Sequence, residues 1–329
     1  MAEELGFSVA HRDCNFDVAV LGEEAGEVQR PLVVLDLDRI DPLDPACKRL
    51  SLPPCPVIGL GDSRHPLAAQ LDCLVEPPIR LEGLMAAICA RPLAASVLVQ
   101  LLRLIEGMDP ARALVAESLA YATLQGGDEH AQWLAARRAA PRDLPAGRLH
   151  VTRVQDVLHL EMDRPGTHNA IDAPLRDALR EALDLAVFDP TIGRVELRGA
   201  GRTFGVGAEL AEFGTTRDPA RAHAIRMQTL PALAAVRCGE RLVSTVQGLC
   251  VGASLELAAF GRIEARRDAI FHLPELAMGL VPGAGGCVSL SRRIGRQRTA
   301  LMVLSGRRIS VETALAWGLA DSCVDALVD

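Results

Sequence analysis

The sequence predicts an α/β protein in which a small α/β unit and a helical segment precede a larger α/β domain. Short β-rich runs bounded by Gly, Pro or Asp open the chain, and the apolar residues change to helical spacing from Leu81. After residue 147, strand-like segments, small-residue turns and helical segments alternate. Such alternation is typical of parallel strands joined by crossover helices.

The first 146 residues divide into two predicted parts. The β-rich runs cover residues 16–21, 32–37, 56–60 and 71–75, and they indicate a small α/β unit over residues 1–80. Helical patterns follow at 81–88, 97–105, 111–124 and 130–136. The stretch AAPRDLPAG at 139–147 is rich in Pro and Gly, as linkers are. We therefore expect a helical segment and linker at 81–146 and the main domain at 147–329.

Composition excludes several classes of protein. The chain has 329 residues, 49% of them hydrophobic, and a formal net charge of -7, which gives no support to nucleic-acid binding. The apolar segment 92–105 is interrupted by Gln100 and Arg103 and is too short to span a bilayer. The N-terminus lacks the basic and apolar pattern of a secretory signal. Nine cysteines form no CxxC pair, which favours reduced thiols in the cytoplasm and no metal site.

The main domain opens with a predicted hairpin, strands 149–154 and 157–162 around Gln155-Asp156. Asp172 or Asn169 is placed to cap the next helix, which has Pro174 in its first turn and runs to about Phe188. A strand at 194–197, a Gly-rich turn at 199–207, another helix and a strand at 242–246 follow.

Two small-residue turns suggest an anion-binding point. In each of the segments 247–257 and 202–210, a strand ends in small residues and leads into a helix, so free backbone N–H groups and the positive helix end converge. If the strands are parallel neighbours, the two turns present N–H groups to one point. Taken alone, the segment 247–257 favours an ordinary strand-to-helix turn.

Glu275 is a candidate acid or base. It follows Pro274 in an apolar setting, and such surroundings raise the pKa of a carboxyl toward the range that acid–base catalysis needs. Taken by itself, this residue is more typical of a helix-capping or surface carboxylate.

The motifs together resemble the crotonase, or enoyl-CoA hydratase/isomerase, family. They are RPGTHNAID, TFGVGAEL, VQGLCVGASLELA, FHLPELAMGLVPGAGG and LSGRRISVETALAWGLAD, in the family's order and spacing over about 180 residues. The resemblance implies a crotonase-like ββα spiral core. It further implies that the backbone N–H groups of Ala208 and Ala253 form an oxyanion hole, and that Glu256 and Glu275 are the two catalytic glutamates.

The same resemblance implies a ligand and an assembly. Positions near the adenine and phosphates of coenzyme A match Arg164, His168, Ala170, Val206, Glu209 and Leu210. Arg164 is the candidate for a phosphate contact, with a solvated turn arginine as the alternative. Coenzyme A would be part of an acyl-CoA substrate, with no separate cofactor, and a homo-oligomer, a trimer or a dimer of trimers, is expected.

The sequence departs from the family in three respects. Ala253 stands where glycine is usual, and Glu209 stands where aspartate is common. The family also usually continues, beyond the position of Asp329, with helices that close the acyl pocket. We expect the N-terminal helices at 81–138 to take over that covering role, because they are apolar and need a surface to bury. The alternative is a more open pocket.

The N-terminal unit weakly resembles part of a receiver-like domain. PLVVLDLD, PVIGLG and LDCLVEPPIRLEGL are similar to later strands of that fold. Glu76 stands where the receivers have lysine, and no acidic cluster for magnesium is evident, so phosphoryl transfer to Asp36 is not expected. We interpret this unit as structural or assembly-forming.

The functional hypothesis is syn hydration of a 2-enoyl-CoA in the cytoplasm, because both glutamates are present. One alternative is another crotonase reaction: isomerisation, thioester hydrolysis, ring cleavage or cofactor-free oxygenation. The other is a non-catalytic CoA-binding partner protein, which has no need for two carboxylates beside an oxyanion hole. The acyl chain and the pathway stay open.

Overall fold

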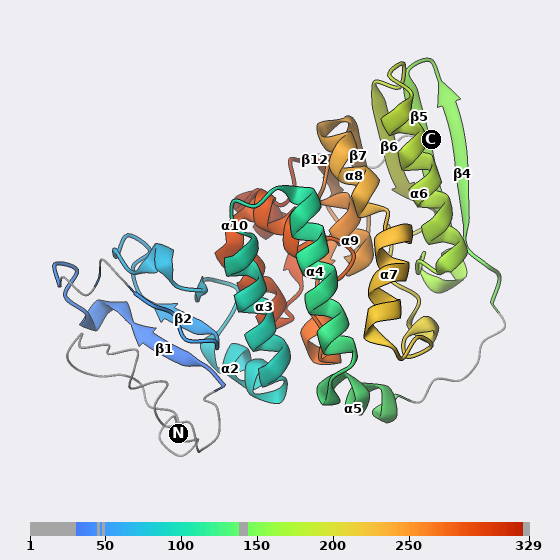
Figure 1. The fold of residues 1–329 in the computed structure, drawn as a ribbon. Helices are drawn as coiled ribbons and strands as arrows, with labels where there is room; N and C mark the ends of the chain where they lie inside the picture. Colours follow the sequence, from blue (N-terminus) through green and yellow to red (C-terminus); the bar gives the residue numbers. More distant parts are fainter. Residues whose placement is uncertain (1–30, 45–46, 48–49, 138–143, 325–329) are drawn as a thin grey trace.

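The computed structural model describes residues 31–44, 47, 50–137 and 144–324, and its first unit is a small parallel sheet (Figure 1). Strands β1 (Val33–Asp36), β2 (Val57–Leu60) and β3 (Cys73–Leu74) lie in that order and are all parallel. The predicted strands at 32–37, 56–60 and 71–75 are confirmed, although the last is shorter than expected. The predicted strand at 16–21 lies outside the described residues.

Four helices follow the small sheet, at the predicted places. They are α2 (Leu81–Ala90), α3 (Pro92–Ile105), α4 (Pro110–Gln125) and α5 (Asp128–Ala136). Helix α4 begins where the Asp109 carboxylate accepts the backbone N–H groups of Ala111 and Arg112, which satisfies donors that a helix start leaves unpaired. Most of the predicted linker lies outside the described residues, so the domain boundary there stays a prediction.

The described part of the chain holds no single helix that is long and apolar enough to cross a membrane. Helices α2 and α3 together reach that length and hydropathy, but they meet at a bend of 106°.

The main domain is an α/β fold with two sheets. A six-stranded sheet has the order β12-β9-β7-β6-β5-β4, and a three-stranded sheet has the order β11-β10-β8. The strands are β4 (Arg148–Val154), β5 (Val157–Asp163), β6 (Arg194–Gly199), β7 (Leu242–Val246), β8 (Leu249–Val251), β9 (Arg262–Arg266), β10 (Ile270–His272), β11 (Ile309–Ser310) and β12 (Ser322–Val324). The β4–β5 hairpin is antiparallel, and β5, β6, β7, β9 and β12 pair in parallel, so both predictions are confirmed.

The helices of the main domain are α6 (Ala173–Phe188), α7 (Pro219–Thr229), α8 (Ala232–Cys238), α9 (Ala253–Ala258), α10 (Gly286–Ser305) and α11 (Val311–Trp317). Of the two predicted caps for α6, Asp172 is the one that accepts a helix N–H, from Leu175. The helix expected directly after the Gly-rich turn is only a short 3₁₀ turn, Leu210–Glu212. Helix α7 begins later, where Asp218 caps it and Pro219 occupies its first turn.

The N-terminal helices cover the main domain, as the sequence analysis expected. Helix α3 packs against α10, and α4 packs against α7, α8 and α10 (Figure 1). Arg226 of α7 donates to the carbonyl and hydroxyl oxygens of Ser118 and to the Gln125 side chain, both on α4. Its guanidinium carbon also lies 4.2 Å from the centre of the Tyr121 ring. The described apolar residues of both parts form one continuous core, so the helices are not an independent appendage.

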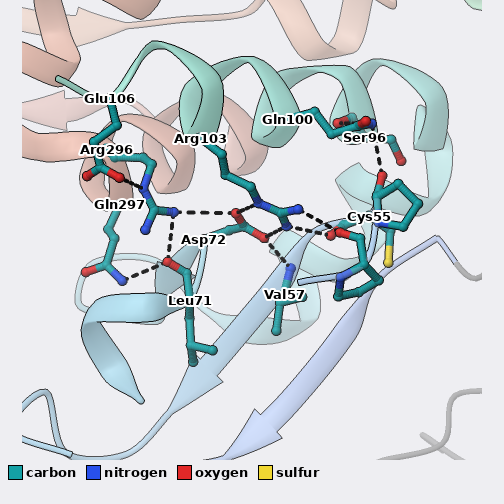
Figure 2. Close-up of polar contacts among 12 residues, drawn as sticks. Cys55, Val57, Leu71, Asp72, Ser96, Gln100, Arg103, Glu106, Arg296 and Gln297 are labelled. Atoms are coloured by element: carbon teal, nitrogen blue, oxygen red, sulfur yellow. Dashed lines mark hydrogen bonds and ion pairs between the residues drawn. The ribbon is translucent and has the colours of Figure 1, made fainter. Parts of the chain in front are cut away.

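A buried carboxylate joins the small sheet to α3 and α10. Figure 2 shows Asp72, whose side chain is 1% exposed, between Arg103 of α3 and Arg296 of α10. Asp72 accepts the Arg103 Nε–H at 2.7 Å and the Val57 N–H at 2.8 Å. Arg103 and Arg296 donate further to carbonyl oxygens of Pro53 and Leu71. The guanidinium groups therefore connect sheet, helix and main domain in one network.

Replacing Asp72 with asparagine should destabilise the fold by about 3 kcal/mol, because two guanidinium groups lose their buried counter-charge. Chemical denaturation monitored by circular dichroism measures the change. The matched control is Asp62→Asn, which disrupts an exposed pair with Arg64 and should leave stability nearly unchanged. Equal stabilities of the two variants would show that the buried network contributes nothing.

Candidate active site

A cavity of about 290 Å³ lies between α4, α7, the start of α9 and the loops that precede α10. Its lining residues come from parts of the chain that lie far apart in sequence. They include Tyr121, Gln125, Val206, Ala208, Glu209, Leu210, Phe213, Arg226, Ala253, Glu256, Glu275, Met278, Gly283 and Ala284. The cavity therefore brings both predicted glutamates and both predicted oxyanion residues to one place.

Two backbone N–H groups are available at the cavity wall. The bridge between Ile171 and Ala208 uses the N–H groups of Ile171 and Glu209, so this pairing leaves the N–H of Ala208 unused. Ala253 is the first residue of α9, where helix geometry provides no intrahelical acceptor for its N–H. A parallel bridge between Gly205 and Cys250 holds the two turns side by side, as expected.

Gly207 permits this close approach. Its φ is +87°, and a β-carbon there would lie 3.0 Å from the Val251 carbonyl oxygen and 3.3 Å from the Ala253 nitrogen. Glycine thus combines a left-handed backbone with the space that the paired N–H groups need. The methyl group of Ala253 leaves its own N–H in place.

Glu256 lies one turn into α9, and its side chain is 2% exposed. Its Oε2 accepts the N–H groups of Ala284 at 2.7 Å and Gly286 at 2.8 Å. Burial raises the pKa of this carboxyl to about 7, while the two N–H donors and the Arg226 cation act in the opposite direction. A group with this pKa exchanges protons readily at neutral pH.

Glu275 begins the 3₁₀ turn Glu275–Met278, and its side chain is 8% exposed. No described residue donates a hydrogen bond to its buried Oε2 atom. Burial, and secondarily the charge of Glu256, raises the pKa of Glu275 well above its ordinary value. The two carboxyls therefore differ in environment: Glu256 has donors that stabilise its charge, whereas Glu275 is stable in the protonated form.

The six predicted CoA-contact residues do not all lie at the cavity. Val206, Glu209 and Leu210 line it, whereas Arg164, His168 and Ala170 do not. Arg164 is a buried residue rather than a solvated turn arginine. Its Nη1 lies 2.7 Å from a Glu209 carboxylate oxygen, and its Nε lies 3.5 Å from that of Asp172.

These contacts give Arg164 a structural role between two loops. Its Nε also donates to the carbonyl oxygen of Pro145 and its Nη1 to that of Ala170, so the Nε and Nη1 donors are used within the protein. His168 is exposed, and Ala170 is buried. Contacts of these three residues with coenzyme A stay predictions.

Sequence reasoning missed three polar residues that the structure brings to the site: Glu117 and Tyr121 on α4 and Arg226 on α7. Tyr121 packs against Gly283, where a β-carbon would lie 2.1 Å from the ring. Glu117 is 1% exposed and lies among Ala113 and Leu114 on the buried face of its helix. The sequence did offer one signal for Glu117: helical spacing places this charged residue on the same face as the apolar Ala113 and Leu114.

No cluster of His, Cys, Asp or Glu side chains within the described ranges has the geometry of a metal site. Besides Glu256 and Glu275, polar side chains such as Tyr121, Glu209 and Arg226 line the cavity.

Sequence comparison relates the chain to known proteins. Residues 152–328 match the family model for enoyl-CoA hydratase/isomerase. The chain is 36% identical over 172 residues to 2,3-dehydroadipyl-CoA hydratase of Escherichia coli, and the match covers 52% of this chain and 67% of that protein. It is 31% identical over 173 residues to the mitochondrial enoyl-CoA hydratase of Pongo abelii, covering 52% of this chain and 59% of that protein. The chain thus spans about two thirds or less of the length of these relatives.

Solved structures agree with these matches. An enoyl-CoA hydratase/isomerase structure from Mycobacterium abscessus has a TM-score of 0.50 and 31% identity, covering 54% of this chain and 71% of that one. Another, from Mycobacterium paratuberculosis, has a TM-score of 0.50 and 27% identity, covering 56% of this chain and 74% of that one. The fold and cavity therefore define a crotonase-type α/β protein. The chain belongs to the enoyl-CoA hydratase/isomerase family.

Proposed function

We propose that the protein catalyses syn addition of water to a 2-enoyl-CoA. The observation that carries this proposal is a pair of buried carboxyls in different surroundings, in a cavity with two unused N–H donors: Glu256 accepts two backbone N–H groups, whereas no described residue donates to Oε2 of Glu275. Hydration needs a base and an acid on the same side of a polarised double bond, and the cavity supplies both.

The reaction begins at the thioester carbonyl. The N–H groups of Ala208 and Ala253 donate to its oxygen and stabilise the negative charge that develops there. Ionised Glu256 takes a proton from water as the water oxygen bonds to the β-carbon. Protonated Glu275 then gives its proton to the α-carbon, which completes the 3-hydroxyacyl-CoA. Proton exchange with solvent restores the two starting forms.

The test is the loss of absorbance of the conjugated enoyl thioester. Purified protein is mixed with crotonyl-CoA and, separately, with a longer 2-enoyl-CoA. Loss of the signal with formation of 3-hydroxyacyl-CoA, identified by mass spectrometry, supports hydration. Stable absorbance with both substrates, despite measured binding of the CoA thioester, contradicts it and favours another reaction of the family.

Arg226 should set the acidic side of the pH profile. Its positive charge holds down the pKa of Glu256, so Arg226→Gln should raise that pKa. Because the base must be ionised, the acidic limb of kcat should move to higher pH, and activity below pH 7 should fall most. Arg226→Lys is the matched control, since it retains the charge while losing the planar contact with Tyr121. An unmoved limb in the glutamine variant would mean that the Arg226 charge does not act on the base.

A further inference from the structure

The backbone N–H groups of residues 284–288, just before and within the first turn of α10, donate to two different carboxylates. Ala284 and Gly286 donate their N–H groups to Glu256. Gly285, Cys287 and Val288 donate theirs to Glu117, at 2.7, 2.8 and 3.3 Å. The same short segment therefore binds the proposed base on one side and a carboxylate from α4 on the other.

Glu117 is suited to hold this segment in place. Both of its oxygens accept hydrogen bonds, Oε1 from Gly285 and Oε2 from Cys287 and Val288. These donors lie at the start of α10, where the helix dipole favours a negative charge, and the Val288 N–H is shared with the Gly285 carbonyl oxygen at 3.1 Å. The side chain is 1% exposed and is not among the residues that line the cavity. Its influence on a substrate must therefore pass through the backbone that it holds.

We propose that Glu117 is a positioning residue for catalysis: by holding the N–H groups of Gly285, Cys287 and Val288, it orients the neighbouring N–H groups that bind Glu256. Helix α4 thereby contributes to the geometry of the active site, in addition to lining the cavity. This inference rests on the proposed function, because it assigns Glu117 a role in the same reaction.

Titratable groups from several elements surround Glu117. They are Arg226 on α7, Glu256 on α9, Glu275 in the 3₁₀ turn and Cys287 on α10. Burial, and secondarily the charge of Glu256, raises the pKa of Glu117 well above its ordinary value, while its three backbone N–H donors act in the opposite direction. The role of Glu117 therefore rests on the hydrogen bonds that its two oxygens accept.

The experiment compares Glu117→Gln with the wild-type full chain in the enoyl-CoA assay. A glutamine has one acceptor oxygen and one NH₂ group, so it cannot serve the donors on both sides. With the N–H groups of the segment misplaced, kcat should fall by roughly 10- to 100-fold. KM should stay within about twofold, because Glu117 does not reach the cavity.

The matched control is Glu129→Gln. Glu129 also caps a helix from a neighbouring one, since it accepts the N–H groups of Leu93 and Ala94 at the start of α3. The Glu129 carboxylate serves α3, and the N–H groups of residues 284–288 donate to Glu256 and Glu117 instead, so kcat should match the wild type. If loss of a helix cap alone reduced activity, kcat would fall in both Glu117→Gln and Glu129→Gln. If Glu117 positions Glu256, kcat should fall only in Glu117→Gln.

A wild-type kcat in a folded Glu117→Gln protein would overturn the inference while the proposed function stands. A wild-type protein without hydratase activity would instead refute the proposed function. If Glu117→Gln does not fold, Glu117→Asp makes the same comparison, since it retains both carboxyl oxygens but is one methylene too short to reach the donors. A reduced kcat with KM within about twofold of the wild type supports the inference, and an unchanged kcat contradicts it.

Discussion

Replacing Glu256 with glutamine should reduce kcat for enoyl-CoA hydration by roughly 10²- to 10⁴-fold, the usual contribution of a general base. The amide oxygen of glutamine can still accept the N–H groups of Ala284 and Gly286, so the loop before α10 should keep its position. The amide cannot take a proton from water. The variant therefore separates the chemical role of this group from its structural one.

The measurement is steady-state hydration of crotonyl-CoA, together with thermal unfolding of each variant. Glu181→Gln, an exposed change on α6, is the control and should be indistinguishable from the wild type. A folded Glu256→Gln enzyme with kcat within twofold of the wild type would remove Glu256 from the mechanism.

Replacing Glu275 with glutamine should cause a loss of similar size, roughly 10²- to 10⁴-fold, and should also change the shape of the pH profile. Because burial raises the pKa of Glu275, its proton is retained to higher pH than that of an ordinary glutamate. The wild-type rate should therefore fall on the alkaline side as Glu275 ionises. It should fall on the acidic side, around pH 7, as Glu256 becomes protonated.

In the Glu275→Gln variant the alkaline limb should disappear, while the acidic limb that belongs to Glu256 remains. Rates measured across both limbs test this, with product identity checked at each pH. An alkaline limb that persists in the variant would identify a different proton donor. Loss of the acidic limb instead would reverse the roles that we assign to the two carboxyls.

The local elements of this fold follow from the sequence because their signals are local. The Asp172 cap and Pro174 mark the start of α6, and the turn at Gln155-Asp156 marks the β4–β5 hairpin. The segment after the Gly-rich turn differs from the prediction. The sequence predicts a helix directly after residue 207, but Gly214 has a φ of +82°, which a helix does not contain, and α7 begins only at Pro219, where Asp218 caps it.

The sequence alone also indicated Glu256, Glu275, Ala208 and Ala253, through motifs whose order resembles the family. Tertiary structure decided what surrounds them. Glu117 and Gly285 are separated by 168 positions, yet they lie 2.7 Å apart at their hydrogen-bonding atoms. Conversely, Arg164 carries a charge suited to phosphate, but packing pairs it with Glu209 and Asp172. Spacing along the chain fixes which residues share a helix face. Only the packing of one helix on another decides which distant group each of them meets, and with it the protonation of buried carboxyls.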